Sequence, residues 1–342
     1  MSKEIYLVTG AAGNLGNSVV ENLLNQGKHV RGFVLKGDPA AKRLPEGTEI
    51  CEGDVTDVDS IERLFAVGPN QDVYVVHCAA IVTVNKDFNQ KVYDVNVQGT
   101  KNIVDACVKH DVKKLVYVSS IGAIPEQPHG TPITEINHYD PDKVVGYYGK
   151  TKAMASQIVM DAVKDYDLDA SVVFPTGICG PNDYAFGPVA SFIIEYCEGK
   201  MSAGIEGSFN AVDARDLADA IIACTTKGRK GEGYILSNER VTMKQMFRLL
   251  SRVTGTEEVT RILPAGIGKL IGRVSDISGR ITGKPQKMTS FAVYSLTRNN
   301  VFDCSKAEEE LGFKTRPFEV SIVDTIEWLE KENRIGTQNE AA

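Results

Sequence analysis

The stretch Val8-Thr9-Gly10-Ala11-Ala12-Gly13-Asn14-Leu15-Gly16 decides the fold of this chain. It begins at the end of a short apolar run and leads into residues 14–26, where apolar residues recur at helical spacing. Between a strand and a helix, the first glycine permits a tight turn, the second lets the backbone approach a pyrophosphate, and the third lets the helix pack closely on the strand. Amides at the helix N-terminus then hold the phosphates. The stretch predicts a dinucleotide site that includes Gly10, Gly13, Asn14, Leu15 and Gly16.

Strand-like and helix-like segments alternate around this turn. Apolar runs typical of strands lie at 5–8, 29–35, 49–51, 73–77, 115–118, 170–174 and 233–236, and helical patterns lie between them at 14–26, 60–65, 92–110 and 148–164. Continuous apolar strands that alternate with helices indicate a parallel sheet covered on both faces, with right-handed crossovers. The predicted fold class is therefore α/β, a Rossmann-type doubly wound parallel sheet, in which ligands collect beyond the carboxyl ends of the strands.

The pattern loosens after Pro181. Helix candidates follow at 186–198, 216–226, 243–253, 262–281, 305–311 and 320–331. We expect residues 1–180 plus about 210–236 to form the dinucleotide-binding domain. About 181–209 plus 237–332 would form a smaller, mostly helical substrate lobe, and 333–342 a flexible tail. In the apolar segment 262–282, frequent glycines lower helix stability, so we expect it to pack in the lobe or wall the substrate site rather than attach to a membrane.

Composition excludes several classes of protein. The net charge of −7 is spread without an acidic or basic block, which argues against nucleic-acid binding. The seven cysteines lie far apart without a Cys-x-x-Cys pair, which is typical of reduced structural thiols and predicts no metal site. The N-terminus shows no signal segment, and no apolar run approaches the roughly 18 residues that span a bilayer. We expect a cytoplasmic protein without stable membrane association.

The end of the second strand bears on the choice between NAD and NADP. An acidic residue there would bind the ribose hydroxyls, whereas a basic residue would suit a 2′-phosphate. The chain has Val34-Leu35-Lys36-Gly37-Asp38, with no acid at the strand end and Lys36 as the nearest charge; Arg31 and Lys42 are close in sequence. The segment therefore favours NADP over NAD, although Lys36 could also be an ordinary loop lysine.

Tyr148 and Lys152 are four residues apart, about one helical turn, which stacks both side chains on one helix face. A free phenol has a pKa of roughly 10, too high for ready proton exchange near neutral pH. A nearby ammonium favours the phenolate and would lower this pKa into the range useful for general acid–base catalysis. The alternative reading of the pair is a solvated helix face.

Ser119 and Ser120 end the fifth strand, near the place where a nicotinamide laid across such a sheet would present its ring. A serine hydroxyl there can hydrogen-bond a substrate oxygen while Tyr148 transfers the proton. The competing idea, a serine nucleophile, lacks a Gly-x-Ser-x-Gly elbow and a recognisable histidine partner. Either serine could also be a strand-end cap, and the adjacent pair leaves the assignment open by one position.

Seven motifs in this order resemble the extended short-chain dehydrogenase/reductases, in the epimerase/dehydratase superfamily. They are Thr9-Gly-Ala-Ala-Gly-Asn-Leu-Gly16, Gly53-Asp-Val-Thr-Asp57, His77-Cys-Ala-Ala80, Asn96-Val-Gln-Gly-Thr100, Val118-Ser-Ser120, Tyr148-Gly-Lys-Thr-Lys152 and Phe174-Pro-Thr-Gly-Ile178. The resemblance covers most of the chain and implies an oxidoreductase that uses NAD or NADP and forms a homodimer through helices flanking the sheet.

The resemblance also implies a role for each matching residue. Tyr148 would be the catalytic acid/base, Lys152 would tune it and bind the nicotinamide ribose, and Ser120 would orient the substrate oxygen. The other implied cofactor contacts are Asp54 and Val55 at the adenine, Ala79 and Ala80 along the cofactor backbone, and Pro175 and Thr176 near the nicotinamide amide. Asn96 matches a family asparagine near the cofactor or its proton path; bracing the long helix is an equally open reading.

Within the family, the chain looks most like the dihydroflavonol reductase and 3β-hydroxysteroid dehydrogenase type. The grounds are Val30-Arg-Gly-Phe-Val34, Asn300-Val-Phe-Asp-Cys-Ser-Lys306 and Glu310-Leu-Gly-Phe313. One departure is Leu35, where such reductases often carry an arginine, so Lys36 would have to replace it. The resemblance predicts reduction of a carbonyl, or oxidation of the alcohol, in a small and mainly apolar substrate such as an aromatic carbonyl or steroid-like compound.

Two other readings remain open. One is a nucleotide-sugar epimerase or dehydratase with tightly held NAD, although no dense set of Arg and Lys is evident in the lobe sequence. The other is a dinucleotide sensor without catalysis, which the retained Tyr148/Lys152 pair disfavours. The lobe aromatics Phe186, Phe192, Tyr196, Phe291 and Tyr294 could line a substrate pocket or form core.

Overall fold

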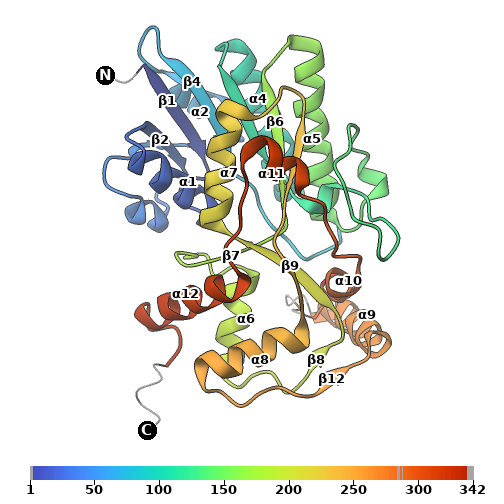
Figure 1. Cartoon of the computed structure of the whole chain (residues 1–342). Coiled ribbons are helices and arrows are strands. Elements are labelled where there is room, and N and C mark those ends of the chain that lie inside the picture. The colour runs from blue at the N-terminus through green and yellow to red at the C-terminus, as the bar shows by residue number, and fades with distance from the viewer. Residues whose placement is uncertain (1–2, 283–285, 287, 337–342) are drawn as a thin grey trace.

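The computed structural model describes residues 3–282, 286 and 288–336. A sheet with helices on both faces is built mainly from the first half of the chain, and a smaller lobe lies below the carboxyl ends of its strands (Figure 1). The C-terminal helix α12 (Phe318–Lys331) belongs to this lobe. Of the expected tail, residues 337–342 lie outside the described residues.

The central sheet has seven parallel strands in the order β10-β6-β5-β4-β1-β2-β3. The strands are β1 (Glu4–Thr9), β2 (His29–Val34), β3 (Glu49–Glu52), β4 (Asp72–His77), β5 (Lys114–Val118), β6 (Ala170–Pro175) and β10 (Gly233–Leu236). Each coincides with an apolar run of the sequence to within two residues at either end. The predicted doubly wound α/β fold is confirmed.

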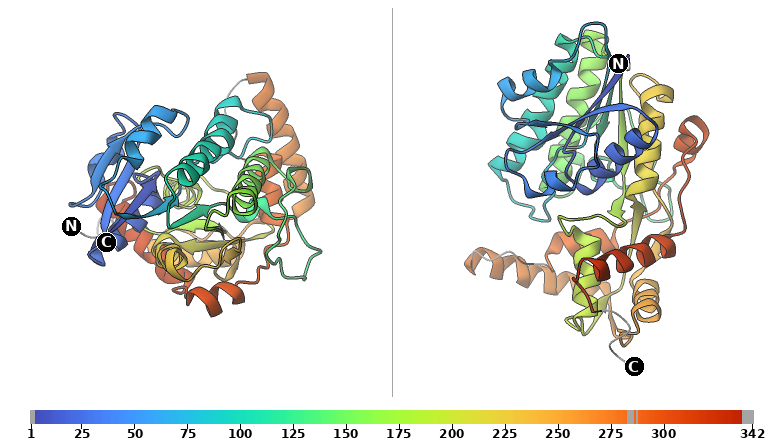
Figure 2. Two further views of the ribbon diagram at one scale, coloured as in Figure 1. Left: turned by 90° about the horizontal axis from the view of Figure 1, so that it is seen from above. Right: turned by 90° about the vertical axis from the view of Figure 1, so that its left-hand side faces the viewer.

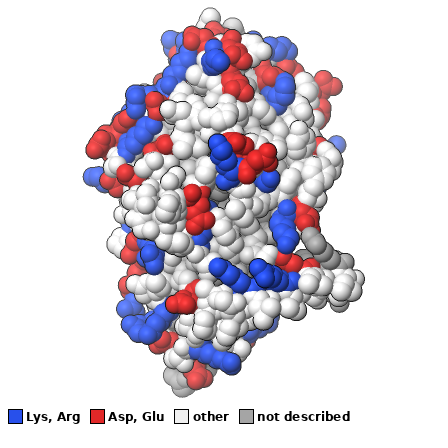
Figure 3. Space-filling view, turned by 90° about the vertical axis from the view of Figure 1, so that its right-hand side faces the viewer, with Lys and Arg blue, Asp and Glu red and all other residues white. Residues whose placement is uncertain are grey.

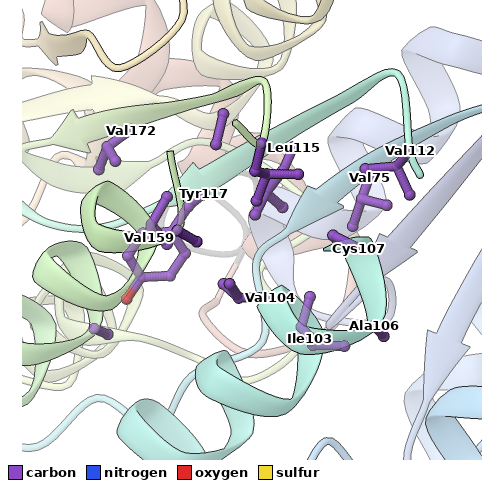
Figure 4. Close-up of a cluster of buried hydrophobic side chains, with 14 of the residues drawn as sticks. Val75, Ile103, Val104, Ala106, Cys107, Val112, Leu115, Tyr117, Val159 and Val172 are labelled. Atoms are coloured by element: carbon purple, nitrogen blue, oxygen red, sulfur yellow. The ribbon is translucent and has the colours of Figure 1, made fainter. Parts of the chain in front are cut away.

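Helices cover both faces of the sheet, as continuous apolar strands require. On one face lie α1 (Asn14–Asn25), α7 (Ala214–Lys227) and α11 (Ser305–Leu311). On the other lie α2 (Val58–Phe65), α4 (Thr100–Lys109) and α5 (Tyr147–Tyr166). Figure 4 shows the second core, where Val75, Leu115 and Val172 of the strands meet side chains of α4 and α5.

The helix expected over 92–110 is continuous but not uniform. A short α3 (Gln90–Tyr93) passes into a π-helical turn, Asp94–Gly99, before α4 begins. Single π turns within helices are frequent at functional sites. The turn contains Asn96, which is fully buried.

The lobe contains more strand than the sequence predicted. Its helices are α6 (Pro188–Cys197), α8 (Met243–Thr254), α9 (Ala265–Thr282), α10 (Ser290–Thr297) and α12. Its strands are β7 (Gly177–Cys179), β8 (Gly204–Ile205), β9 (Ser208–Asp213), β11 (Arg240–Thr242) and β12 (Ile262–Leu263), in sheets β11-β9-β7 and β12-β8. None of these five strands was predicted, and neither was α10.

The expected helix over 262–281 is wrong at its start. Residues Ile262–Leu263 pair with β8, and α9 begins only after Pro264. Proline cannot donate a backbone hydrogen bond, so it separates the strand from the helix. Within the described part of the chain, no helix is long and apolar enough to cross a membrane.

Candidate active site

The turn after β1 has the geometry that the three glycines predicted. Gly10 has a φ of +66°, and a Cβ there would lie 2.8 Å from the backbone nitrogen of Ala79. A Cβ on Gly16 would lie 2.1 Å from the Gly10 carbonyl oxygen, so only glycine lets α1 approach the turn this closely. The Gly13 amide donates to the same oxygen at 3.0 Å. The cradle therefore fits a pyrophosphate held by backbone amides at the start of α1.

Asn14 and Leu15 begin α1, directly behind this cradle. The Asn14 Oδ1 atom is buried and has no hydrogen-bond partner among the described residues, so it can accept a hydrogen bond from a bound molecule. Leu15 is 7% exposed and packs in the core beneath the turn. Of the two predicted contacts, Asn14 has a free polar group and Leu15 supports the turn.

A buried polar chain joins the glycine turn to the next strand end. The Thr9 hydroxyl lies 2.6 Å from His77 Nδ1 and accepts from the Ala79 amide at 3.3 Å, while His77 Nε2 lies 3.0 Å from the Thr100 hydroxyl. Burial lowers the pKa of His77 to about 3, so the ring is neutral. This network holds Ala79 and Ala80 beside the cradle. Sequence spacing alone does not show which of these side chains meet, so the network could not be predicted from it.

At the expected adenosine end, Leu35 and Lys36 follow β2 and are exposed. Arg31 is committed elsewhere, because its guanidinium pairs with Glu49 and donates to the carbonyls of Leu64 and Ala66. Asp38 accepts from the Ala40 amide and caps a short 3-10 helix. Lys36 is thus the basic residue nearest the end of β2 whose side chain has no hydrogen-bond or ion-pair partner among the described residues.

Asp54 and Val55 follow β3 at the same edge. The Asp54 carboxylate accepts from the amide and hydroxyl of Thr56, so it shapes its own loop. Val55 is 5% exposed and packs against Gly99, where a Cβ would lie 2.6 Å from the valine Cγ2. The adenine contact expected of both residues stays a prediction, and little of the Val55 side chain is exposed for it.

Asn96 braces two segments of the site. Its Oδ1 accepts from the Ile81 amide at 2.7 Å, and its Nδ2 donates to the Ile81 carbonyl and the Thr151 hydroxyl. The bracing interpretation fits this geometry, although the partner is the loop after β4 rather than a strand. Asn96 thereby links that loop to the helix that carries Tyr148.

The structure distinguishes the two serines after β5. Ser119 is 3% exposed, and its hydroxyl lies 2.7 Å from that of Ser156, inside the protein. Ser120 is half-buried, caps the turn Ile121–Ala123, and lies close enough to Tyr148 to lower the pKa of the phenol. The geometry therefore places Ser120, not Ser119, beside the phenol.

Close backbone packing brings Tyr148 to Ser120. A Cβ on Gly149 would lie 2.6 Å from the Gly122 carbonyl oxygen, so the two glycines let the start of α5 touch the turn after β5. Burial raises the pKa of Tyr148 to about 12, and the nearby Ser120 hydroxyl only partly opposes this rise. The expected lowering of this pKa by Lys152 is thus not seen, and the phenol stays protonated at neutral pH.

Lys152 is 2% exposed and lies below Tyr148 on α5. Its ammonium donates to the Val118 carbonyl at 2.7 Å and lies 4.4 Å from the centre of the Tyr117 ring. Burial lowers its pKa to about 7, and no carboxylate of the described residues pairs with it. A bound molecule with an anionic group or a hydroxyl group would stabilise a buried ammonium in this position.

Pro175 and Thr176 close the site at the end of β6. Both are buried, and the Thr176 amide donates to Leu236 of β10 while its hydroxyl donates to Asn210 at 2.8 Å. Thr176 thus ties β6 to β10 and to the lobe strand β9. Among the described residues, no group of three or more His, Cys, Asp and Glu side chains could hold a metal ion.

The lobe aromatics divide between core and site. Phe192 and Tyr196 stack on Phe247, and Phe186 stacks on Trp328, all inside the lobe core. Phe291 of α10 instead packs on Gly146, directly before α5, where an added Cβ would lie 2.3 Å from the ring. Phe291 therefore lies closest to the Tyr148 end of α5.

Comparison with known proteins agrees with this geometry. The model of the NAD dependent epimerase/dehydratase family matches residues 6–237. The chain is 28% identical to the sterol demethylase protein B of Methylococcus capsulatus, over 96% of this chain and 99% of that protein. It is 25% identical to a putative dihydroflavonol 4-reductase of Synechocystis, over 98% of this chain and 97% of that protein.

Two further similarities complete the comparison. Isoform 1 of the 3beta-hydroxysteroid-dehydrogenase/decarboxylase of Arabidopsis thaliana is 26% identical, over 97% of this chain and 82% of that protein. The crystal structure of gox2253 is 27% identical, with a TM-score of 0.84 over 97% of this chain and 99% of that one. Because the family model matches more than half of its residues, the chain belongs to the NAD dependent epimerase/dehydratase family, the extended short-chain dehydrogenase/reductases, whose members use a nicotinamide dinucleotide.

Proposed function

We propose that this protein is an NADP(H)-dependent oxidoreductase that reduces a ketone or aldehyde, or oxidises the corresponding alcohol, in a small and mainly apolar substrate. One observation carries the proposal: Ser120, Tyr148 and Lys152 converge where β5 ends and α5 begins, beside a cradle that fits a dinucleotide. A protein that only senses a dinucleotide has no need of a buried lysine beneath a half-buried tyrosine.

A bound nicotinamide dinucleotide supplies the hydride for reduction, or accepts it in the reverse reaction. The Ser120 hydroxyl donates a hydrogen bond to the substrate oxygen and orients it towards Tyr148. The Tyr148 phenol donates its proton to that oxygen as the alcohol forms, and it later regains a proton from solvent. Its high pKa keeps the phenol protonated and so suits the reductive direction.

Lys152 has two tasks in this proposal. Its ammonium binds a ribose hydroxyl of the dinucleotide, and its charge stabilises the phenolate that remains after Tyr148 has donated its proton. The buried position strengthens both interactions, because little water screens the charge. Asn96 positions this machinery through Thr151, one residue before Lys152.

The preference for NADP(H) rests on the end of β2. Residues 34–37 contain no acid to bind ribose hydroxyls, the neighbouring Glu52 of β3 accepts from the Gly37 amide, Arg31 is occupied, and Lys36 is exposed. A flexible lysine beside the strand end suits a 2′-phosphate as a point charge.

The proposal of an apolar substrate is based on the apolar residues that cover the site. Phe291 packs on the turn before Tyr148, and Val145 beside it is 50% exposed. The relatives named for sterols, steroids and dihydroflavonols suggest a ring compound of that kind.

A second candidate is a nucleotide-sugar epimerase or dehydratase, which one cavity favours. This cavity, about 740 Å³, lies in the lobe, and Arg240, Lys244 and Arg298 line it together with one acid, Glu206. The lobe sequence shows no dense cluster of Arg and Lys, but folding brings these three basic side chains around one cavity. They could bind the phosphates of a nucleoside diphosphate.

A substrate panel distinguishes the two candidates. Aromatic carbonyls, steroid ketones and nucleotide sugars are incubated with NADPH or NADH, and nicotinamide absorbance is followed. The proposal predicts stoichiometric consumption of NADPH with an apolar carbonyl. Conversion of a nucleotide sugar without net change in absorbance would favour the epimerase, and would refute the proposal.

A further inference from the structure

Helix α9 carries its aliphatic side chains on the outside. The residues concerned, here called the α9 face, are Ile267 (47% exposed), Leu270 (63%), Ile271 (39%), Val274 (59%), Ile277 (57%) and Ile281 (80%). At 100° per residue they fall within an arc of about 120°, so they form one continuous stripe along the helix. The expectation that the segment 262–282 packs in the lobe or walls the substrate site therefore holds for Ile262, which packs in the lobe core, and is wrong for these six residues of α9.

The inner side of α9 consists of glycines and polar groups. A Cβ on Gly268 would lie 2.7 Å from Ile205, and one on Gly272 would lie 2.8 Å from the backbone of Ser290. Asp276 also points inward, where it pairs with Lys86 at 2.8 Å and accepts from the Ser290 amide. The helix is thus held to the protein by its small and polar side, the reverse of an ordinary surface helix.

The outer side is also the part of the molecule that protrudes. Figure 2 (right) shows α9 projecting sideways from the lobe, and Figure 3 shows mostly uncharged surface on the projecting part. A contiguous exposed apolar stripe commonly marks an interaction site.

The charge beside the stripe is positive. Arg273 is exposed and borders the α9 face on one side; Lys269 is also exposed but lies further round the helix, next to the position of Asp276, the acid of this helix, which is turned inward and paired. The whole chain carries a net charge of −7, so this border differs from the rest of the protein. An apolar stripe bordered by a basic side chain suits a bilayer with anionic headgroups.

The apolar surface continues towards the candidate active site. The Lys86–Asp276 ion pair holds the loop after β4 against α9, and this loop exposes Val82 (63%), Val84 (42%) and Phe88 (66%). The same loop contains Ala79, whose backbone lies beside Gly10 of the dinucleotide cradle, and Ala80. A surface that docked through α9 and this loop would have the mouth of the site close to it.

We propose that the α9 face, together with Val82, Val84 and Phe88, docks the protein on the surface of a lipid bilayer that contains anionic headgroups. The helix lies in the interface and does not span the membrane, because its inner side stays bound to the lobe. This inference goes beyond the proposed function and revises the expectation of no stable membrane association.

A second copy of the chain fits the α9 face less well. A two-fold contact centred on Val274 would place Arg273 near the same residue of the other copy, and like charges repel across such an isologous interface. Anionic headgroups instead neutralise Arg273.

The test is flotation of the full-length protein with vesicles of phosphatidylcholine alone or with roughly one-third phosphatidylglycerol. The test variant replaces Leu270, Val274 and Ile277 with serine. A control variant makes three comparable changes elsewhere, Ile50→Ser, Val58→Ser and Val320→Ser, at residues that are 51%, 55% and 42% exposed.

We expect the wild type and the control variant to float with anionic vesicles, and the test variant to bind at least about tenfold more weakly. Arg273→Gln should weaken binding to anionic vesicles about fivefold without affecting the fold. Circular dichroism verifies that each variant is folded.

Two results would overturn the proposal. One is a wild type that fails to float, or a test variant that floats as well as the control. The other is a wild type that dimerises in light scattering and does not float, while the test variant is a monomer; the α9 face would then belong to a second copy. Neither readout requires turnover, so failure here is distinguishable from failure of the proposed reaction.

Discussion

Lys152→Met should stabilise the free protein while it abolishes activity. The ammonium is 2% exposed, donates to the Val118 carbonyl at 2.7 Å and has no carboxylate partner among the described residues. Methionine keeps most of the side-chain volume and removes the charge. A buried charge that serves catalysis is stabilised poorly in the empty site, so its removal should raise the free energy of unfolding.

The magnitude follows from the pKa of Lys152, which falls from 10.5 to about 7 in the folded protein. Because each pKa unit corresponds to about 1.4 kcal/mol, the buried ammonium costs up to about 5 kcal/mol at pH 6, where it is protonated in both the folded and unfolded states. Above pH 7 the folded protein releases this proton while the unfolded chain keeps it. Stability of the wild type therefore rises between pH 7 and 10.5, and at pH 9 the remaining cost is about 2 kcal/mol.

The assay is equilibrium denaturation by urea, followed by circular dichroism, at pH 6 and pH 9 without cofactor. The variant should be more stable than the wild type at pH 6, and its advantage should shrink by about 3 kcal/mol at pH 9. Lys114→Met is a matched control, because Lys114 is equally buried but pairs with Asp169 at 2.6 Å and donates to the Gly228 carbonyl. That change should destabilise the protein by about 1 to 3 kcal/mol at both pH values.

The reasoning would be refuted by a Lys152→Met variant less stable than the wild type at pH 6. An advantage of equal size at pH 6 and pH 9 would also refute it, because the stabilisation would then not come from the titration of this ammonium.

Three further predictions concern the site. Ser120→Ala should lower kcat roughly a hundredfold, whereas Ser119→Ala should leave it within a few-fold, because Ser120 lies beside the Tyr148 phenol and the Ser119 hydroxyl bonds Ser156 instead; equal losses in steady-state assays would contradict this assignment. Gly149→Ala should lower kcat roughly tenfold to a hundredfold with little change in dinucleotide affinity, since the new Cβ pushes α5 away from Gly122; unchanged kcat would show that the close approach is dispensable. Lys36→Ala should weaken NADPH binding about fivefold in a fluorescence titration and leave NADH binding unchanged, and an equal effect on both would remove the basis for the NADP preference.

The central sheet could be predicted from the sequence because its strands are buried on both faces. Such strands appear as continuous apolar runs, and the glycine turn fixed where the first helix begins. The lobe strands could not be predicted in this way. β8 and β12 have two residues each, and they are strands only because segments far apart in sequence meet. Tertiary contact, which no local pattern reveals, decides their conformation.

The candidate site, too, could be predicted only in part from the sequence. Helical spacing placed Tyr148 and Lys152 on one element, but it did not show that Lys152 is buried against Tyr117 and Val118. The lowered pKa of Lys152 and the raised pKa of Tyr148 both follow from that burial. Likewise, two adjacent serines on an extended chain point to opposite sides, and only the packing of α5 shows that Ser120 meets the phenol. For α9, periodicity predicts that the helix has an apolar side but does not show whether that side faces the lobe or the solvent. The structure shows that it faces the solvent.

The most direct test of the proposed reaction is the Tyr148→Phe variant, assayed with NADPH and the substrate that the panel identifies. The change removes one oxygen atom and the transferable proton, while the ring and its packing remain. Turnover should fall at least about a thousandfold, and NADPH affinity by fluorescence titration should stay within a few-fold of the wild type. A variant that retains wild-type turnover would contradict the central claim that Tyr148 is the proton donor.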